Sequence, residues 1–380
     1  MLYLFIAAVV LVISFYASTQ NKSKYLISLK VCYCLVFFVW GFEYFNTVDY
    51  NVMLEKYNLV NYNIFSGAMF EDDIEPVSKI LLILTKPIGN IGYYVVAALF
   101  EVLCFYFMTK NLIQRKFIWI FFILLLINFD NVICMMTLKR QFLSTCVSFL
   151  ALYILVNNKK NNQIYAFLLL LIAFNIHRSA FFNFLIFPLY HFKYRPFLKG
   201  IYFMIPLFFI QYFVNISTFS VFLFDAISIN SDKYAHYANQ LEVAVNFTPV
   251  YILYRFMLYV IFLFSLSRVS NKELPLIYCS LFYLLTYNFL SNDIGRMLLL
   301  YNLSIIFTVP IILNYFKNFK IRALVISYVV LVSFRLLYNG YTDSNPFSMT
   351  YGYKEFNTIF EASSLQIDNP IGEKSKFLRR

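Results

Sequence analysis

Four short polar motifs interrupt long apolar segments of this 380-residue chain, and their residue types could carry chemistry. Arginine is planar and permanently charged, and it binds phosphate groups through two parallel hydrogen bonds. A histidine or a carboxylate beside such arginines could take the proton from an attacking hydroxyl. Ionisable groups near a bilayer are costly and are therefore functional candidates. The motifs are Lys139-Arg140 in CMMTLKRQFLS, His177-Arg178 in AFNIHRSAFF, Asp293 with Arg296 in SNDIGRMLLLY, and Arg335 in VSFRLLY.

Two longer segments, 47–77 and 217–248, carry further candidates. Both are rich in Tyr, Asn and acidic residues, which suit sugars through stacking and hydrogen bonding. Loops of more than about 12–15 residues are usually functional or disordered, and we expect these two to be ordered caps at the membrane interface. Glu75 precedes Pro76, a pair that predicts a carboxylate at a helix N-terminus. The candidates in these segments are Asp49, Tyr50, Glu75, Lys233, Tyr234 and Tyr237.

The elements that position these residues are predicted to be membrane helices. The chain is 61% hydrophobic and 13% charged, whereas soluble domains average about 45–50% apolar and 25% charged residues. Its apolar blocks approach the roughly 20 residues that cross a bilayer as helix. We therefore expect an all-α integral membrane protein, a polytopic bundle of about twelve transmembrane helices with two long external loops. The expected spans are near 2–18, 27–46, 90–109, 117–136, 141–156, 163–176, 179–191, 199–216, 249–267, 275–291, 296–316 and 322–338.

Charge predicts the orientation of these helices. The net charge is +12, and the basic residues concentrate in alternate short connections, which the positive-inside rule assigns to the cytoplasm. Both termini and all the candidate motifs then lie on the external face. The apolar stretch 163–190 has basic connections on both sides, so it must be two short spans with an outward turn at His177-Arg178. Residues 77–88, broken by LTKPIGN, indicate a half-helix. The simplest division is a membrane domain, 1–338, and an external tail, 339–380.

Several function classes lose support from composition. No basic face interleaved with aromatic residues appears, which argues against nucleic acid. The six cysteines show no zinc-ligand spacing, and no HExxH or DxD motif is present, so we expect neither a metal nor another cofactor. Structural alternatives remain for each motif: a basic residue at a helix end can extend to the headgroups, Asp293 and Arg296 can form a helix-start ion pair, and His177 can simply hold a turn.

The motifs also carry a family resemblance. The stretches TVDYNVMLEKYN, DIEPVSKILLILTKPIGN, TLKRQFLSTCVSFLALYIL, LLIAFNIHRSAFF, DKYAHYANQ and SNDIGRMLLLYNL, in that order, resemble the EpsG family of exopolysaccharide polymerases, which is related in role to Wzy-type O-antigen and capsule polymerases. The chain departs from the family pattern where Arg178 intervenes between His177 and Ser179, and where Asp49 and Tyr50 are adjacent.

The resemblance implies a glycosyltransferase that joins oligosaccharide repeat units on undecaprenyl diphosphate at the outer face of the bacterial inner membrane. Its partners would be the lipid-linked donor and acceptor and membrane lipids, with a chain-length regulator and a flippase as candidates. We expect His177 or Asp49 to act as base and Arg140 and Arg296 to contact the diphosphate. Residues expected to bind or position substrate are Arg178, Glu75, Asp293, Tyr50, Lys233, Tyr234, Tyr237, Lys139 and Arg335.

Two rival functions remain at this point. An O-antigen ligase would use the same chemistry with a lipid-core acceptor. A flippase or other transporter would place its charges near the membrane midplane on broken helices, often in two related halves. The charges here cluster at the predicted outer face, and no internal repeat is visible.

Overall fold

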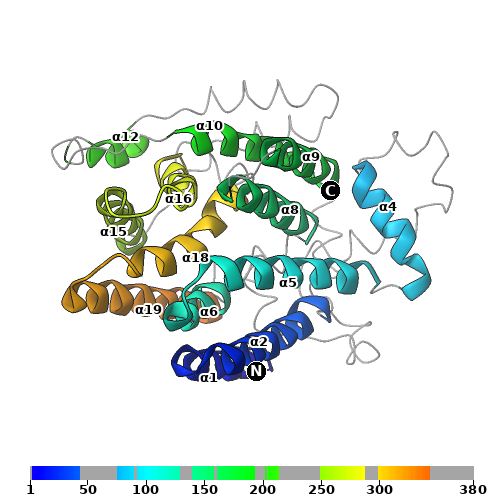
Figure 1. Ribbon diagram of the computed structural model, residues 1–380, viewed down its shortest axis with the longest axis horizontal. Coiled ribbons are helices and arrows are strands. Elements are labelled where there is room, and N and C mark those ends of the chain that lie inside the picture. Colours follow the sequence, from blue (N-terminus) through cyan, green and yellow to red (C-terminus); the bar gives the residue numbers. More distant parts are fainter. Residues whose placement is uncertain are drawn as a thin grey trace.

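The computed structural model describes residues 2–42, 75–89, 92–128, 139–157, 161–192, 202, 204–213, 249–286 and 298–342. Within these ranges every regular element is a helix and no strand occurs, which confirms the all-α prediction (Figure 1). The elements are α1 (Leu2–Thr19), α2 (Lys22–Gly41), α4 (Pro76–Thr85), η2 (Lys86–Ile88), α5 (Gly92–Leu112), η3 (Arg115–Phe117), α6 (Ile118–Leu126), α8 (Lys139–Val156), α9 (Asn162–Ile176), η4 (Arg178–Leu185), α10 (Ile186–His191), α12 (Leu207–Phe213), α15 (Pro249–Ser265), α16 (Leu274–Thr286), α18 (Leu299–Leu313) and α19 (Phe319–Thr342).

Five of these helices, α1, α2, α5, α8 and α19, are long and apolar enough to cross a membrane. Four shorter apolar helices of 10–17 residues accompany them, within α9, α15, α16 and α18. These helices indicate a membrane protein. The count of about twelve crossings stays a prediction, because several helices are shorter than the roughly 20 residues that a crossing requires. The two long external loops lie outside the described residues, apart from 75–77 at the start of α4.

Some helix boundaries differ from those predicted. Helix α2 begins at Lys22 rather than near residue 27, because the side chain of Asn21 caps it by accepting the Lys24 N–H at 3.0 Å. The predicted span 179–191 begins instead as the 3₁₀ helix η4 and becomes α-helical only at Ile186. Helix α19 continues to Thr342, past the predicted domain boundary at residue 338.

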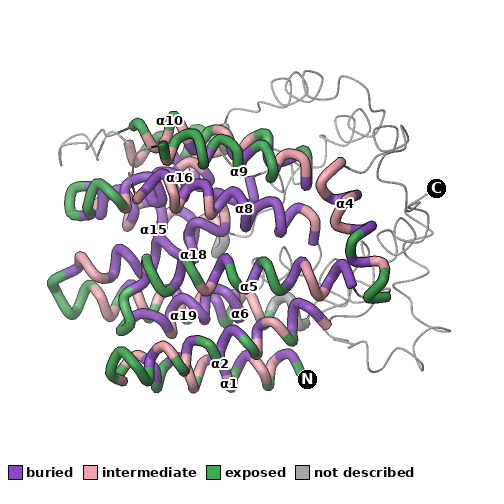
Figure 2. Tube along the Cα trace, turned by 45° about the vertical axis from the view of Figure 1, so that its right-hand side comes forward, coloured by how far each residue is buried: buried purple, intermediate pink, exposed green. Residues whose placement is uncertain are grey.

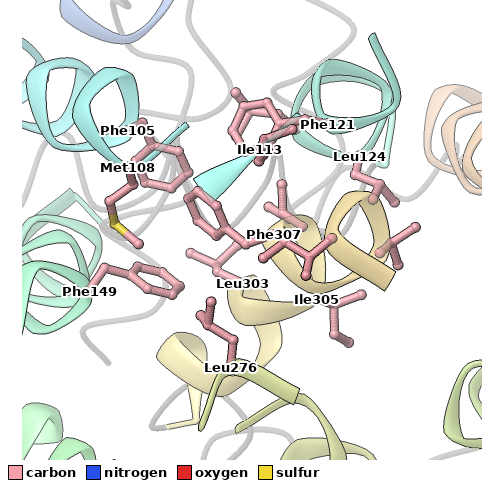
Figure 3. Close-up of a cluster of buried hydrophobic side chains, with 14 of the residues drawn as sticks. Phe105, Met108, Ile113, Phe121, Leu124, Phe149, Leu276, Leu303, Ile305 and Phe307 are labelled. Atoms are coloured by element: carbon pink, nitrogen blue, oxygen red, sulfur yellow. The ribbon is translucent and has the colours of Figure 1, made fainter. Parts of the chain in front are cut away.

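An aromatic cluster forms the centre of the bundle. Phe307 of α18 packs against Phe105 of α5, Phe121 of α6 and Phe149 of α8, with ring centroids 5.3–5.4 Å apart (Figure 3). All four side chains are fully buried. The helices run side by side, with buried residues facing this centre and exposed apolar residues outside (Figure 2). Exposed apolar side chains on helices of this length are the surface that lipid would cover.

A tight connection joins α4 to α5 and positions the start of both. Pro87 lies in η2, and Gly89 adopts a φ of +96°, a left-handed conformation that suits glycine. Gly92 then begins α5 so close to α4 that an added Cβ would overlap the carbonyl oxygen of Thr85. The LTKPIGN stretch therefore ends a short helix, as predicted. The half-helix in the bilayer stays a prediction.

Candidate active site at the ends of α4, α8 and α9

The His177-Arg178 pair lies at a reversal of the chain. Helix α9 ends at Ile176, and His177 is extended, with φ −155° and ψ 126°. Phe167, near the start of α9, packs against Phe184 and Phe187 at centroid distances of 5.8 and 6.4 Å. Residues on either side of the pair therefore run back along each other. The predicted turn between two short helical segments is confirmed.

The first three backbone N–H groups of η4 are all satisfied at this turn. The Arg178 N–H donates to Oε1 of Glu75 at 3.1 Å. The Ser179 N–H donates to Nδ1 of His177 at 3.2 Å, and the Ser179 hydroxyl lies 2.7 Å from the same nitrogen. The Ala180 N–H donates to the carbonyl of His177 at 3.0 Å. Two residues that the sequence marked as functional thus cap this short helix.

Glu75 joins three segments of the chain. It precedes the first residue of α4, where a carboxylate also interacts favourably with the helix dipole. Its Oε2 accepts from a guanidinium nitrogen of Arg140, on the first turn of α8, at 2.8 Å. Its other oxygen holds the Arg178 N–H. The side chains of Glu75 and Arg140 are 8% and 16% exposed, so the pair lies at the edge of the packed interior and remains partly accessible.

Hydroxyl groups fasten the surrounding helices. Ser78 of α4 is fully buried and donates to the carbonyl of Ile176 at 2.7 Å. Ser144 of α8 donates to the carbonyl of Ala173 on α9 at 2.9 Å. Both acceptors belong to the last turn of α9, just before the His177-Arg178 reversal. These contacts place α4, α8 and the reversal in register at one end of the bundle, beside α4 at the right of Figure 1.

The Arg178 side chain is exposed at this turn. The cluster described so far therefore holds two guanidinium groups and one carboxylate. Among the described residues, Glu75 pairs with Arg140, and no carboxylate is paired with the Arg178 guanidinium. A positive charge at a helix end, backed by buried hydrogen bonds, is a suitable environment for an anionic ligand such as a diphosphate.

Lys139 requires a correction, because it was expected to contact substrate. Its side chain is 2% exposed, its ammonium lies 2.9 Å from Oε2 of Glu101, and it donates to the carbonyl of Trp40 at 2.9 Å. Glu101 itself is fully buried on α5. Lys139 therefore joins α8 to α2 and α5. The side chain of Lys139, the first residue of α8, therefore lies in the packed interior, whereas the side chain of Arg140, one residue later, contacts Glu75.

The remaining predicted site residues either lie away from this cluster or fall outside the described residues. Arg335 is exposed on α19, with its guanidinium 5.7 Å from the ring centroid of Tyr338. Within the described ranges, no three His, Cys, Asp or Glu side chains gather closely enough to hold a metal ion. The other predicted site residues lie outside the described residues: Asp49, Tyr50, Lys233, Tyr234, Tyr237, Asp293 and Arg296.

Sequence reasoning passed over several residues that support the site. Ser78, Ser144 and Asn183 are buried and hydrogen-bonded, Asn183 through its amide nitrogen to the Ser148 hydroxyl at 2.8 Å. A serine is common in membrane helices, where it bonds to its own backbone. Of these residues, only Asn183 gave a signal in the sequence, because an asparagine in an apolar segment is costly without a hydrogen-bond partner.

Fold and site together define a polytopic helical membrane protein in which arginines and a glutamate from three separate segments meet at one end of the bundle. A comparison with known families makes this more specific. The chain belongs to the EpsG family, whose profile matches residues 26–357. Membership implies a polysaccharide-polymerase-like function and a place in polysaccharide biosynthesis at a membrane. No curated protein and no solved structure matches the chain.

Proposed function

We propose that this protein is a glycosyltransferase that polymerises undecaprenyl-diphosphate-linked oligosaccharide repeat units at the outer face of the bacterial inner membrane. The observation that carries the proposal is the convergence of Arg140 and Arg178 on one carboxylate, that of Glu75, at 2.8 and 3.1 Å. The two contacts use different groups, the guanidinium of Arg140 and the backbone N–H of Arg178. The two arginines therefore belong to different segments and lie at the same end of the bundle.

The chemistry follows from where charge develops. A hydroxyl at the non-reducing end of one lipid-linked unit attacks the anomeric carbon of the growing chain. A new glycosidic C–O bond forms, the bond to the diphosphate oxygen breaks, and undecaprenyl diphosphate leaves with the electron pair. Arg178, together with Arg140 and Arg296, stabilises the negative charge on the departing diphosphate. The proton of the attacking hydroxyl passes to a base, for which Asp49 is our candidate.

Glu75 is a positioning residue in this proposal. Both of its carboxylate oxygens accept hydrogen bonds from the protein. A carboxylate held in this way serves to hold Arg140 in place. The Arg178 guanidinium, which has no carboxylate partner among the described residues, would pair with a negative charge of the ligand. The tail of a lipid-linked substrate would lie along the exposed apolar faces of the neighbouring helices.

The test is polymer production in cells that lack their own copy of the gene. Arg178→Ala is expected to lower polymer yield about 10²–10³-fold, the usual effect of removing one stabilising donor from a reacting anion. Arg268→Ala is the matched control, because Arg268 is exposed in the connection after α15 and is expected to leave yield unchanged. Both variants must accumulate in the membrane to wild-type levels.

The products distinguish the proposal from its rivals. A defective polymerase leaves single repeat units on the lipid carrier, whereas a defective ligase leaves long polymer there. Purified protein in liposomes should polymerise lipid-linked repeats supplied on its outer side, which a transporter would not do. Normal polymer ladders from Arg178→Ala at normal protein levels would remove the arginine cluster from the mechanism.

A further inference from the structure

Each donor at the start of η4 has a protein acceptor, and two of these acceptors belong to His177. Its ring nitrogen Nδ1 takes the Ser179 N–H at 3.2 Å and its carbonyl takes the Ala180 N–H at 3.0 Å. The first N–H groups of a helix have no partner within the helix, and a side chain that accepts from them acts as an N-cap. His177 meets this definition, with extended backbone angles of −155° and 126°.

The same contact favours one tautomer of His177, in which the Ser179 hydroxyl, 2.7 Å from Nδ1, can donate to that nitrogen as well. A backbone N–H can only donate, so Nδ1 must present its lone pair. A neutral imidazole with a lone pair on Nδ1 carries its proton on Nε2. The ring then has no other lone pair in its plane. A proton could be taken from a substrate only at Nδ1, and the incoming proton would displace the Ser179 N–H.

The helix that His177 caps is unusual and needs support. η4 keeps 3₁₀ geometry over eight residues, whereas 3₁₀ runs longer than three or four residues are uncommon. The Tyr301 hydroxyl, on α18, donates to the carbonyl of Phe182 at 2.6 Å. The amide of Asn183 donates to Ser148 of α8 at 2.8 Å. Side chains from two neighbouring helices therefore hold the far part of η4, while His177 and Glu75 hold its start.

We infer that His177 is a positioning residue, a neutral N-cap that holds the start of η4 so that Arg178 projects from the turn, and that it does not act as the base. The inference rests on the proposed function, because it assigns a role within that site. It leaves Asp49 as the base candidate of the two that the sequence offered. The property that matters at position 177 is then an acceptor at the place of Nδ1.

Two substitutions separate the ring nitrogens. The Oδ1 of asparagine occupies the place of Nδ1 relative to Cβ, and asparagine is among the preferred N-cap residues. The amide of glutamine reaches the place of Nε2 but caps poorly. His177→Asn is expected to keep polymer yield within about threefold of wild type, while His177→Gln and His177→Ala lower it by about fivefold or more, a loss in line with removal of a helix cap.

Hydrogen exchange provides a readout that does not depend on activity. Full-length protein in detergent is compared by mass spectrometry over peptides that contain residues 178–180. Exchange of these amides is expected to be faster in His177→Ala and His177→Gln than in wild type, and close to wild type in His177→Asn. This measurement also covers the case in which a variant accumulates poorly, because any folded fraction reports the state of the turn.

The outcomes are distinct from those that test the proposed function. If all three substitutions at position 177 abolish polymer at normal protein levels, with normal exchange at the turn, His177 is a base and the inference is wrong. If His177→Gln is active and His177→Asn is not, Nε2 is the group required and the inference is again wrong. A normal yield from Arg178→Ala would instead remove the proposed site, whatever the result at position 177.

Discussion

Two ion pairs begin at neighbouring residues of α8, and they differ in almost every respect. Lys139 pairs with Glu101 at 2.9 Å with both side chains buried, and Arg140 pairs with Glu75 at 2.8 Å with the arginine partly exposed. The first pair joins α8 to α5 in the interior. The second joins α8 to the start of α4 at the end of the bundle. Adjacent charges of the same sign thus serve packing in one case and, in our proposal, a substrate site in the other.

Both pairs address the same physical difficulty. A cation at the N-terminus of a helix is unfavourable, because the dipole makes that end positive. α8 begins with two cations, and each is balanced by a carboxylate from a different segment. Burial decides what each pair can do in addition. The Lys139–Glu101 pair has no exposed surface to offer a ligand, whereas the Arg140–Glu75 pair does.

The largest expected effect comes from breaking the Arg140–Glu75 pair. Arg140→Ala should lower polymer yield about 10²–10³-fold, because in the proposed mechanism it removes a charge that stabilises the departing diphosphate. Arg140→Lys should fall between this variant and wild type, since lysine keeps the charge but loses the planar fork. Polymer ladders, compared at equal membrane protein levels, measure both. Wild-type ladders from Arg140→Ala would mean that the Arg140–Glu75 pair, like the Lys139–Glu101 pair, serves only the packing of the helices.

Breaking the Lys139–Glu101 pair should lower the stability of the fold instead. Glu101→Leu leaves the Lys139 ammonium buried without its carboxylate, which costs about 3–5 kcal/mol. Thermal unfolding of purified protein in detergent should show a clear loss of stability. The double variant Glu101→Leu with Lys139→Met should recover most of it, because replacing both members of a buried pair by apolar residues is often neutral.

The double variant is also the sharpest test of the comparison. It is expected to make polymer at close to the wild-type level, since neither residue contacts the site. If the double variant is stable but makes no polymer, the buried pair has a role beyond packing, and the contrast between the two pairs fails.

The sequence predicted a good deal of this arrangement, and the reasons for success and failure are physical. The His177-Arg178 turn followed from segment length and charge, because two basic connections on one side cannot flank a single crossing. Glu75 at a helix start followed from the proline after it. Both rules are local or depend on the bilayer alone, so they need no knowledge of which helices touch.

Contacts between distant segments could not be predicted in this way. Nothing in the sequence indicates that Glu101, deep in one apolar segment, meets Lys139 in another. Lys139 was therefore assigned to the site along with its neighbour Arg140. The direction in which each side chain points depends on the rotation of α8 against α2 and α5. The first half of α8, KRQFLSTCVS, mixes polar and apolar residues without a clear face. Only the packed structure separates the two residues.

The smallest expected effect concerns the hydrogen bond that holds α4 against the reversal. Ser78→Ala removes the donor to the carbonyl of Ile176 and should cost about 1 kcal/mol in stability, the usual net value of one such bond. Ser333→Ala is the matched control, because Ser333 is also fully buried but its hydroxyl has no hydrogen-bond partner among the described residues. Thermal unfolding in detergent compares the two. Because Ser78 lies one turn after Glu75, its loss should also lower polymer yield slightly, whereas Ser333→Ala should not. Equal effects of the two substitutions on unfolding would show that this hydrogen bond does not hold α4 in place. The position of Glu75 in the Arg140–Glu75 pair would then depend on the apolar packing of α4.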